Sequence, residues 1–354
     1  MRRGFAISGV ALALAPLASV PAQRLTPAGV DSSLAPYADT TNSVRLPDGR
    51  MLHLVCMGQG SPTVIFNGGG DTWSTMWNTV QPEVAQKTRA CAWDRQALGL
   101  SSAGPEVPTV EHNVADLDAA LKLAGIAGPY VVVGHSLGGY DSVIFADRHK
   151  EDVVGMVLVD PTPAADPDAP PDPATPNINA LMAGEPPFIT MLQRCAAGLR
   201  AGTLHSGAPD PDNCLNPPPP PAEYPPELRD ALLALRVGAT PQATAAALDN
   251  IAYYSSAARI AADTRAAYNP ARNYGAMPLI VLSAGDSGIS PNNPPEINAE
   301  LPALMAFKQR AHEHLATLST RGVHRIIADS PHDIPHVKPQ AVIDAIDEVV
   351  DAAR

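Results

Sequence analysis

Short buried strands and helix-like segments follow one another in a regular order along the sequence, and this order limits the folds that the chain can adopt. Apolar, β-branched runs such as "YVVVGHS" alternate with segments of helical periodicity such as "VEHNVADLDAALKLAGI". Strands that alternate with helices predict a largely parallel sheet with helices on both faces. Asp48-Gly49, between two strand-like runs, predicts an antiparallel hairpin at the start of this sheet.

The alternation stops after residue 160 and resumes near residue 276. Eighteen of the 38 prolines lie between residues 161 and 226, and five of them are consecutive, from 217 to 221. Because proline interrupts the interior of a helix, this stretch predicts irregular chain, followed by an Ala-rich helical part. The sequence therefore predicts a core of residues 41–160 and 276–354, with an inserted cap of residues 161–275.

Residues 1–22 have the pattern of a signal for export. Arg2 and Arg3 precede an uncharged, mostly apolar run, and the small residues before position 23 predict cleavage near Ala22. The two arginines also fit a twin-arginine signal. The run is short for a membrane-spanning helix, which needs about 20 residues, so we expect no stable span after cleavage. Residues 23–40 lack periodicity and predict a surface linker.

The composition bears on partners and compartment. The formal net charge is −12 and no Lys/Arg cluster offsets it, which argues against binding to the phosphates of nucleic acids. A small neutral substrate fits this charge better. Four cysteines in an exported chain fit two disulfides, although the count does not give their pairing. No metal or organic cofactor is called for, and the sequence leaves the oligomeric state open.

Gly134-His135-Ser136-Leu137-Gly138 matches the pattern G-x-S-x-G between a strand and a helix. Glycines on either side of the serine leave room for a sharp turn that holds it in a strained backbone conformation. Such a turn exposes the Ser136 hydroxyl above the sheet and directs the N–H of Leu137 toward an oxyanion. We therefore predict that Ser136 is a nucleophile.

A serine hydroxyl needs a base, and the base needs a third group to orient it. His332 follows the last predicted strand, at the edge of the sheet where sites assemble, and is favoured over His336 and His324. Two aspartates that follow strands compete for the third position. The sequence favours Asp286, after "PLIVLSAG", and keeps Asp160, after "VVGMVLV", as the alternative acid.

The segment "VIFNGGGDTW" places small residues directly after a strand. The N–H of Gly69 is the predicted partner of the Leu137 N–H in an oxyanion hole, and Gly70 is the alternative. Two further histidines, His312 and His314, are two positions apart on a predicted helix and are expected at the surface. Asp141 is expected on a helix surface or facing the cap.

Together these segments resemble the α/β-hydrolase fold superfamily over nearly the whole mature length. The serine turn, the "NGGG" loop, "CAWDRQALGLSSAG" and "SPHDIPHVKPQAVIDAI" follow one another in the family's order. Asn67 stands where the family usually has a histidine, and Ala97 where a glycine is usual. The interval from His332 to Pro339 resembles the family's terminal histidine motif. The resemblance implies a mostly parallel, eight-stranded sheet flanked by helices, with the cap inserted.

The resemblance also implies that the second and fourth strands are neighbours. Cys56 lies on the second strand and Cys91 on the fourth, so a bridge between them is expected, which leaves Cys195 and Cys214 for the cap. Asp286 stands about one residue early against the family's acid motif. Some branches of the superfamily place the acid one strand earlier, which keeps the alternative acid open.

A serine in the turn counts against haloalkane dehalogenases and epoxide hydrolases, which need a carboxylate there. The leading expectation is hydrolysis of a small or hydrophobic carboxylic ester through an acyl-enzyme. An amidase or peptidase, or a cofactor-free perhydrolase, would use the same three residues. A catalytically silent binding module on the same scaffold is the alternative from a different class of protein.

Overall fold

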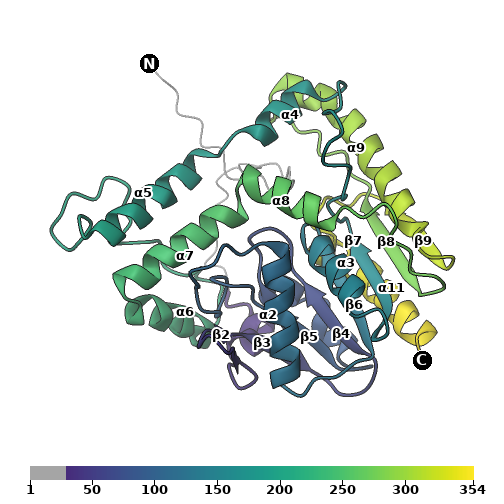
Figure 1. Ribbon diagram of the computed structural model, residues 1–354, viewed down its shortest axis with the longest axis horizontal. Helices are drawn as coiled ribbons and strands as arrows, with labels where there is room; N and C mark the ends of the chain where they lie inside the picture. The colour runs from purple at the N-terminus through teal and green to yellow at the C-terminus, as the bar shows by residue number, and fades with distance from the viewer. Residues whose placement is uncertain (1–28) are drawn as a thin grey trace.

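The structure is a computed structural model, and it describes residues 29–354. The expected export signal lies outside the described residues. A seven-stranded sheet with the order β3-β5-β4-β6-β7-β8-β9 forms the centre of the molecule (Figure 1). Its neighbouring strands are parallel, apart from the antiparallel pair β3 and β5. The strands are β3 (Leu54–Met57), β4 (Thr63–Asn67), β5 (Ala90–Trp93), β6 (Tyr130–His135), β7 (Val153–Val159), β8 (Leu279–Ala284) and β9 (Gly322–Ile327).

The predicted mostly parallel sheet is confirmed, but its strand number differs from the expected eight. Within the described part of the chain, β1 (Val44–Arg45) and β2 (Met51–Leu52) form a separate two-stranded sheet around the Asp48-Gly49 turn. In the described residues these two strands, each two residues long, pair with each other and not with the central sheet. The central sheet therefore begins with β3.

Helices cover both faces of the sheet, and a separate apolar core lies between the sheet and the helices on each face. On one face lie α2, α3 and α9, and on the other lie α1 and α11. Two short 3-10 helices and α10 connect these elements. The bounds are η1 (Ser32–Ala38), η2 (Ser74–Trp77), α1 (Gln81–Val84), α2 (Val110–Leu123), α3 (Gly138–Arg148), α9 (Pro295–Ala316), α10 (Ile334–Val337) and α11 (Pro339–Ala352).

Five helices lie between β7 and β8, where the sequence predicted the cap (Figure 1). They are α4 (Pro176–Ala183), α5 (Pro187–Ala201), α6 (Pro226–Gly238), α7 (Pro241–Tyr254) and α8 (Ala257–Ala267). The expectation of irregular chain up to residue 226 is therefore wrong for α4 and α5. The prolines stand at the start of α4, α5, α6 and α7, where a missing N–H costs no hydrogen bond.

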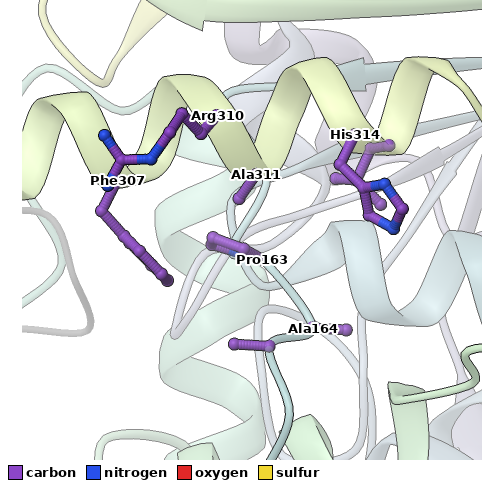
Figure 2. Close-up of a pocket in the computed structure, with 8 residues that line it drawn as sticks. Pro163, Ala164, Phe307, Arg310, Ala311 and His314 are labelled. Carbon is purple, nitrogen blue, oxygen red and sulfur yellow. The ribbon is translucent and has the colours of Figure 1, made fainter. Parts of the chain in front are cut away.

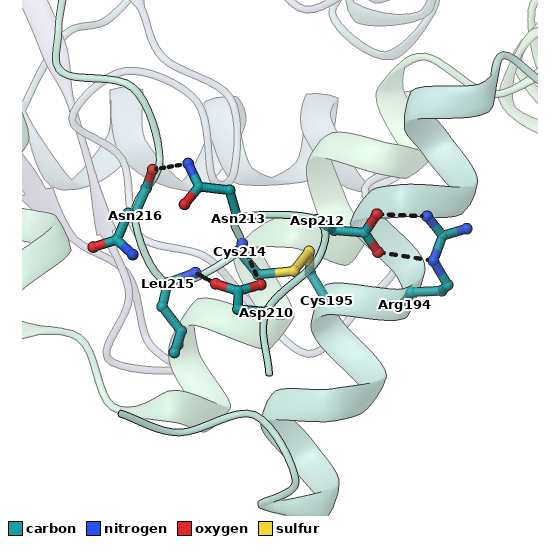
Figure 3. The surroundings of a disulfide bond; sticks show 8 residues. All are labelled: Arg194, Cys195, Asp210, Asp212, Asn213, Cys214, Leu215 and Asn216. Carbon is teal, nitrogen blue, oxygen red and sulfur yellow. Dashed lines mark hydrogen bonds and ion pairs between the residues drawn. A yellow bond between two sulfur atoms is a disulfide. The ribbon is translucent and has the colours of Figure 1, made fainter. Parts of the chain in front are cut away.

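Both expected disulfides are present. Cys56 and Cys91 face each other on the paired strands β3 and β5. Cys195 of α5 is bonded to Cys214 in the following loop, where Asp210 accepts the N–H of Cys214 at 2.8 Å (Figure 3). Two disulfides indicate an oxidising compartment.

Where the structure describes it, the segment expected as a surface linker packs on the core. The 3-10 helix η1 buries Leu34 and Tyr37, and the Tyr37 hydroxyl donates to Oε1 of Gln81 at 3.0 Å. Among residues 29–354, no helix has the length and apolar character needed to cross a membrane.

Candidate active site

The serine turn lies between the end of β6 and the start of α3. Ser136 has φ of 54°, in the left-handed region that a residue with a side chain rarely adopts. The flanking glycines are required by close packing. A Cβ at Gly134 would lie 2.4 Å from Oγ of Ser142, and one at Gly138 would lie 2.3 Å from the carbonyl oxygen of Asn67. The predicted strain at the serine is therefore present.

Asn67, the departure from the family pattern, supports the loop that follows β4. Its Nδ2 donates to Oγ of Ser142 at 2.8 Å, and its Oδ1 accepts the indole N–H of Trp93 at 3.0 Å. Asn67 is 1% exposed, and both hydrogen-bonding ends of its amide are used. The side chain therefore fixes the start of the loop to α3 and to β5.

His332 lies beside the serine turn. Nε2 of His135, the residue before Ser136, donates to the carbonyl oxygen of His332 at 3.0 Å, and the two imidazole rings are 4.6 Å apart. Burial, together with the neighbouring His332, lowers the pKa of His135 to about 3. A neutral His135 therefore holds the main chain of His332 at the turn.

The structure pairs His332 with Asp160. Nδ1 of His332 donates to Oδ2 of Asp160 at 2.5 Å. Asp286 is exposed, and its Oδ1 accepts the N–H of Gly288 at 3.0 Å. The preference for Asp286 is thus corrected in favour of the alternative. The reason is topological: Asp160 follows β7, the direct neighbour of β6, whereas Asp286 follows β8, one strand farther from the serine turn.

Asp160 is 1% exposed and lies among hydrogen-bond donors. Its Oδ1 accepts the N–H of Ala284 at 3.1 Å, and its Oδ2 accepts from Nζ of Lys308 at 2.6 Å. Burial alone would raise the pKa of Asp160, but the hydrogen bond from His332 and the charge of Lys308 outweigh it and hold that pKa well below its usual range. The carboxylate is therefore charged.

Lys308 was not among the residues predicted for the site, and His312, expected at the surface, is 0% exposed. One ring nitrogen of His312 contacts the carbonyl of Pro161 at 2.7 Å, and the other contacts Oγ of Ser283 at 2.6 Å. Burial lowers the pKa of His312 to about 4, although Asp160 opposes the shift. The four-residue spacing of positions 308, 312 and 316 would have placed both side chains on the buried face of α9.

The two rival histidines have other partners. Nδ1 of His336 pairs with Asp333 at 2.7 Å, and Nε2 of His324 pairs with Oγ of Ser283 at 2.7 Å. The structure thus brings His332, rather than these two, to Asp160.

The glycine loop after β4 lies against the serine. A Cβ at Gly69 would be 3.0 Å from Cβ of Ser136. In the part of the chain that the structure describes, the N–H groups of Gly69, Gly70 and Leu137 donate to no backbone carbonyl. Leu137 also caps the N-terminus of α3, where backbone N–H groups favour negative charge. These N–H groups suit a developing oxyanion.

A guanidinium lies behind this loop. Arg95, 2% exposed, donates from Nη2 to the carbonyls of Gly69, Gly70 and Thr72, at 2.6 Å for Gly70 and 3.1 Å for Thr72. Nη2 carries two hydrogens, so at least one of them is shared between two of these carbonyls, and together the contacts fix the backbone of the loop on the side away from solvent.

Asp141, expected on a helix surface or facing the cap, is 0% exposed. Its Oδ2 is 3.6 Å from Nη1 of Arg95, and within residues 29–354 neither carboxylate oxygen has a hydrogen-bond partner. Burial raises the pKa of Asp141 to about 6, although Arg95 and Arg259 oppose the shift. Asp141 is therefore a buried titratable group close to the serine turn.

A separate cavity of about 270 Å³ lies between the start of the cap and α9 (Figure 2). Pro163 lines it from the start of the cap, and Phe307, Arg310 and His314 line it from α9. Ser136, His332 and Asp160 do not line this cavity. In the described part of the chain, no three His, Cys, Asp or Glu side chains gather as a metal site would require.

Several curated proteins are similar to part of the chain. The uncharacterised protein YqjL of Bacillus subtilis is 31% identical over 104 residues, which are 29% of this chain and 41% of that protein. A haloalkane dehalogenase of Sphingobium indicum is 29% identical over 116 residues, which are 32% of this chain and 39% of the enzyme. The matched regions therefore span less than half of these relatives.

Solved structures match over more of the chain. A thermophilic esterase from Thermogutta terrifontis has a TM-score of 0.50 at 22% identity, with 88% of this chain and 98% of the esterase covered. The epoxide hydrolase CorEH has a TM-score of 0.55 at 19% identity, with the same two coverages. At such identities the likeness concerns the fold. A family model described as "Alpha/beta hydrolase family" matches residues 63–345, which are most of the chain. The chain therefore belongs to the alpha/beta hydrolase family.

Proposed function

We propose that the protein is a serine hydrolase in which Ser136 is the nucleophile, His332 the base and Asp160 the acid. The observation that carries the proposal is the hydrogen bond from Nδ1 of His332 to Asp160 beside a serine at positive φ. A proton on Nδ1 leaves Nε2 free to accept the proton of a hydroxyl. The carboxylate holds the imidazole in this tautomer and stabilises the imidazolium that forms.

In the proposed reaction Oγ of Ser136 attacks the substrate carbonyl while Nε2 of His332 takes the hydroxyl proton. The N–H of Leu137, with that of Gly69 or Gly70, stabilises the oxyanion. His332 returns the proton to the leaving alcohol, and the acyl group stays on Ser136. Water, activated by His332, then releases the acid and restores the free serine.

The proposed substrate is a small or hydrophobic carboxylic ester. Ser136 occupies the turn where dehalogenases and epoxide hydrolases need a carboxylate, so an acyl transfer fits this chain better than either of those reactions. Ser136 is 3% exposed, and the chain that enters the cap donates the N–H of Thr162 to its carbonyl oxygen at 2.9 Å. The cap is therefore expected to select the substrate.

We further propose that the protein is exported. Residues 1–22 have the composition of a signal, and the two disulfides suit the oxidising compartment that such a signal would reach. The net charge of −12 is more compatible with a small neutral substrate than with a nucleic acid.

Hydrolysis of p-nitrophenyl esters of graded acyl length, by the purified protein and by Ser136→Ala, tests the proposal. We expect activity in the former and its loss in the latter, with covalent labelling of Ser136 by a fluorophosphonate. Labelling without ester hydrolysis would favour an amidase or peptidase. A folded protein with neither property would leave the binding module as the better reading.

A further inference from the structure

Two buried guanidinium groups meet at the loop after β4, and one of them comes from the cap. Arg259, on α8, donates from Nη1 to the carbonyl oxygen of Gly70 at 3.1 Å. Gly70 also accepts from Arg95 on the core side, at 2.6 Å. Arg259 is 0% exposed. A charged side chain of the inserted cap is thus buried in contact with the glycine loop whose N–H groups are proposed to stabilise the oxyanion.

The position of Arg259 is fixed by further bonds. Its Nε donates to Oδ2 of Asp263 at 2.8 Å, and its Nη1 also donates to the carbonyl of Tyr254 at 3.1 Å. Oδ1 of Asp263 accepts the N–H of Val110 at the start of α2, at 3.0 Å. The network therefore joins α8 of the cap to α2 of the core as well as to the loop.

The ring of Tyr254 adds a second contact between the two guanidinium groups. It lies 4.9 Å from the guanidinium carbon of Arg259 and 5.1 Å from that of Arg95. The cation–π geometry favours both positions. Burying charges in this way is costly compared with apolar packing, so simple attachment of the cap does not require it.

The bonds to the carbonyl oxygens also orient the N–H groups of the loop. In a trans peptide the C=O and the following N–H point in opposite directions. The carbonyl of Gly69 is bonded to Arg95, so the N–H of Gly70 points away from that guanidinium. The carbonyl of Gly70 belongs to the next peptide, whose N–H is that of Asp71, and both arginines bond it. Arg259 therefore acts on the Gly70 N–H indirectly, by fixing the peptide that follows it. Donors fixed before reaction are the ones that stabilise an oxyanion most effectively.

We infer that Arg259 is a positioning residue, which holds the oxyanion loop from the cap side and so couples the cap to catalysis. This inference rests on the proposed serine hydrolase function. The cap would then have a second role besides selecting the substrate. Without α8 in place, the loop would keep the contact with Arg95 and lose the one with Arg259.

The test compares Arg259→Met and Arg259→Lys with the matched control Arg265→Met. Arg265 lies on the same helix, but its side chain is 62% exposed and pairs with the exposed Asp168 at 3.0 Å. Two readouts are needed: kcat and KM on p-nitrophenyl acetate, and hydrogen exchange of the peptide that spans residues 67–76.

For Arg259→Met we expect kcat to fall about 10-fold, less than the loss of an oxyanion donor itself, with KM changed less than about twofold. Exchange in the loop should become faster. Arg259→Lys should lose less, because the ammonium keeps the charge without the fork of donors. Arg265→Met should match the wild type in both readouts.

A folded Arg259→Met protein with wild-type kcat, or with unchanged loop exchange, overturns the inference. If this variant does not fold, the same two readouts on Arg259→Lys decide. Failure of the proposed function is distinguishable, because the wild type itself would then neither hydrolyse esters nor be labelled at Ser136 by a fluorophosphonate. That outcome also removes the catalytic part of the inference.

Discussion

Nδ1 of His332 and Oδ2 of Asp160 are 2.5 Å apart, although 172 residues separate them in the chain. Asp160 is the first residue after β7, and His332 lies in the loop between β9 and α10. Both loops leave the sheet at the carboxyl ends of parallel strands, where residues distant in sequence meet. Asp286, one strand farther from the serine turn, is exposed and takes no part in this pair.

The first prediction concerns the acid. Asp160→Asn should lower kcat/KM for ester hydrolysis by about 10³–10⁴-fold, because an amide can stabilise the wrong tautomer of the imidazole. Asp286→Asn should change kcat/KM less than about twofold, since its carboxylate bonds only a local turn. Steady-state kinetics of both variants check this. The reverse ranking would return the acid to Asp286.

The second prediction concerns the ion pair between Lys308 and Asp160. Lys308→Met should lower the free energy of unfolding by about 3–5 kcal/mol, because it leaves a buried carboxylate with one cation fewer. Lys122→Met is the control: Lys122 pairs with Asp118 at 2.8 Å, but its side chain is 72% exposed, so the cost should be below about 1 kcal/mol. Urea denaturation at neutral pH measures both. Equal losses would contradict the structural role given to Lys308.

The third prediction concerns Asp141, because burial raises the pKa of its carboxyl from the ordinary 3.8 to about 6. Between these two pH values the folded protein binds more protons at this site than the unfolded chain does. The site's contribution therefore lowers stability as the pH rises through this window, and the full penalty is present above the folded-state pKa.

Asp141→Asn removes this titration. Its stability relative to the wild type should therefore increase from pH 4 to pH 7, by on the order of 2 kcal/mol. Denaturant unfolding of both proteins across this range provides the measurement. A difference between the two proteins that does not vary with pH would show that Asp141 does not titrate in the folded state within this window.

The parts of the molecule that depend on local physics could be predicted from the amino-acid sequence. The serine turn is one, because no other residue type replaces the glycines at positions 134 and 138 without a clash. The alternation of strands and helices is another. Apolar residues recur with one spacing in strands and another in helices, and these spacings predict which element forms and which of its faces is buried. The break in this alternation marked where the cap enters and leaves the sheet. With the strand order implied by the resemblance, the pairing of the cysteines followed as well.

Which of two equivalent aspartates meets His332 could be learned from the three-dimensional structure alone. Both follow a strand at the same edge of the sheet, and the choice depends on how close each strand lies to the serine turn and on where the chain goes next. It also decided the burial of Lys308 and Arg259, since a charged side chain enters a protein interior only when distant partners compensate it. Lys308 meets Asp160 from another element. Arg259 has one partner on its own helix, Asp263, but its contact with the carbonyl of Gly70 joins residues 189 positions apart, and the local sequence does not predict either distant contact.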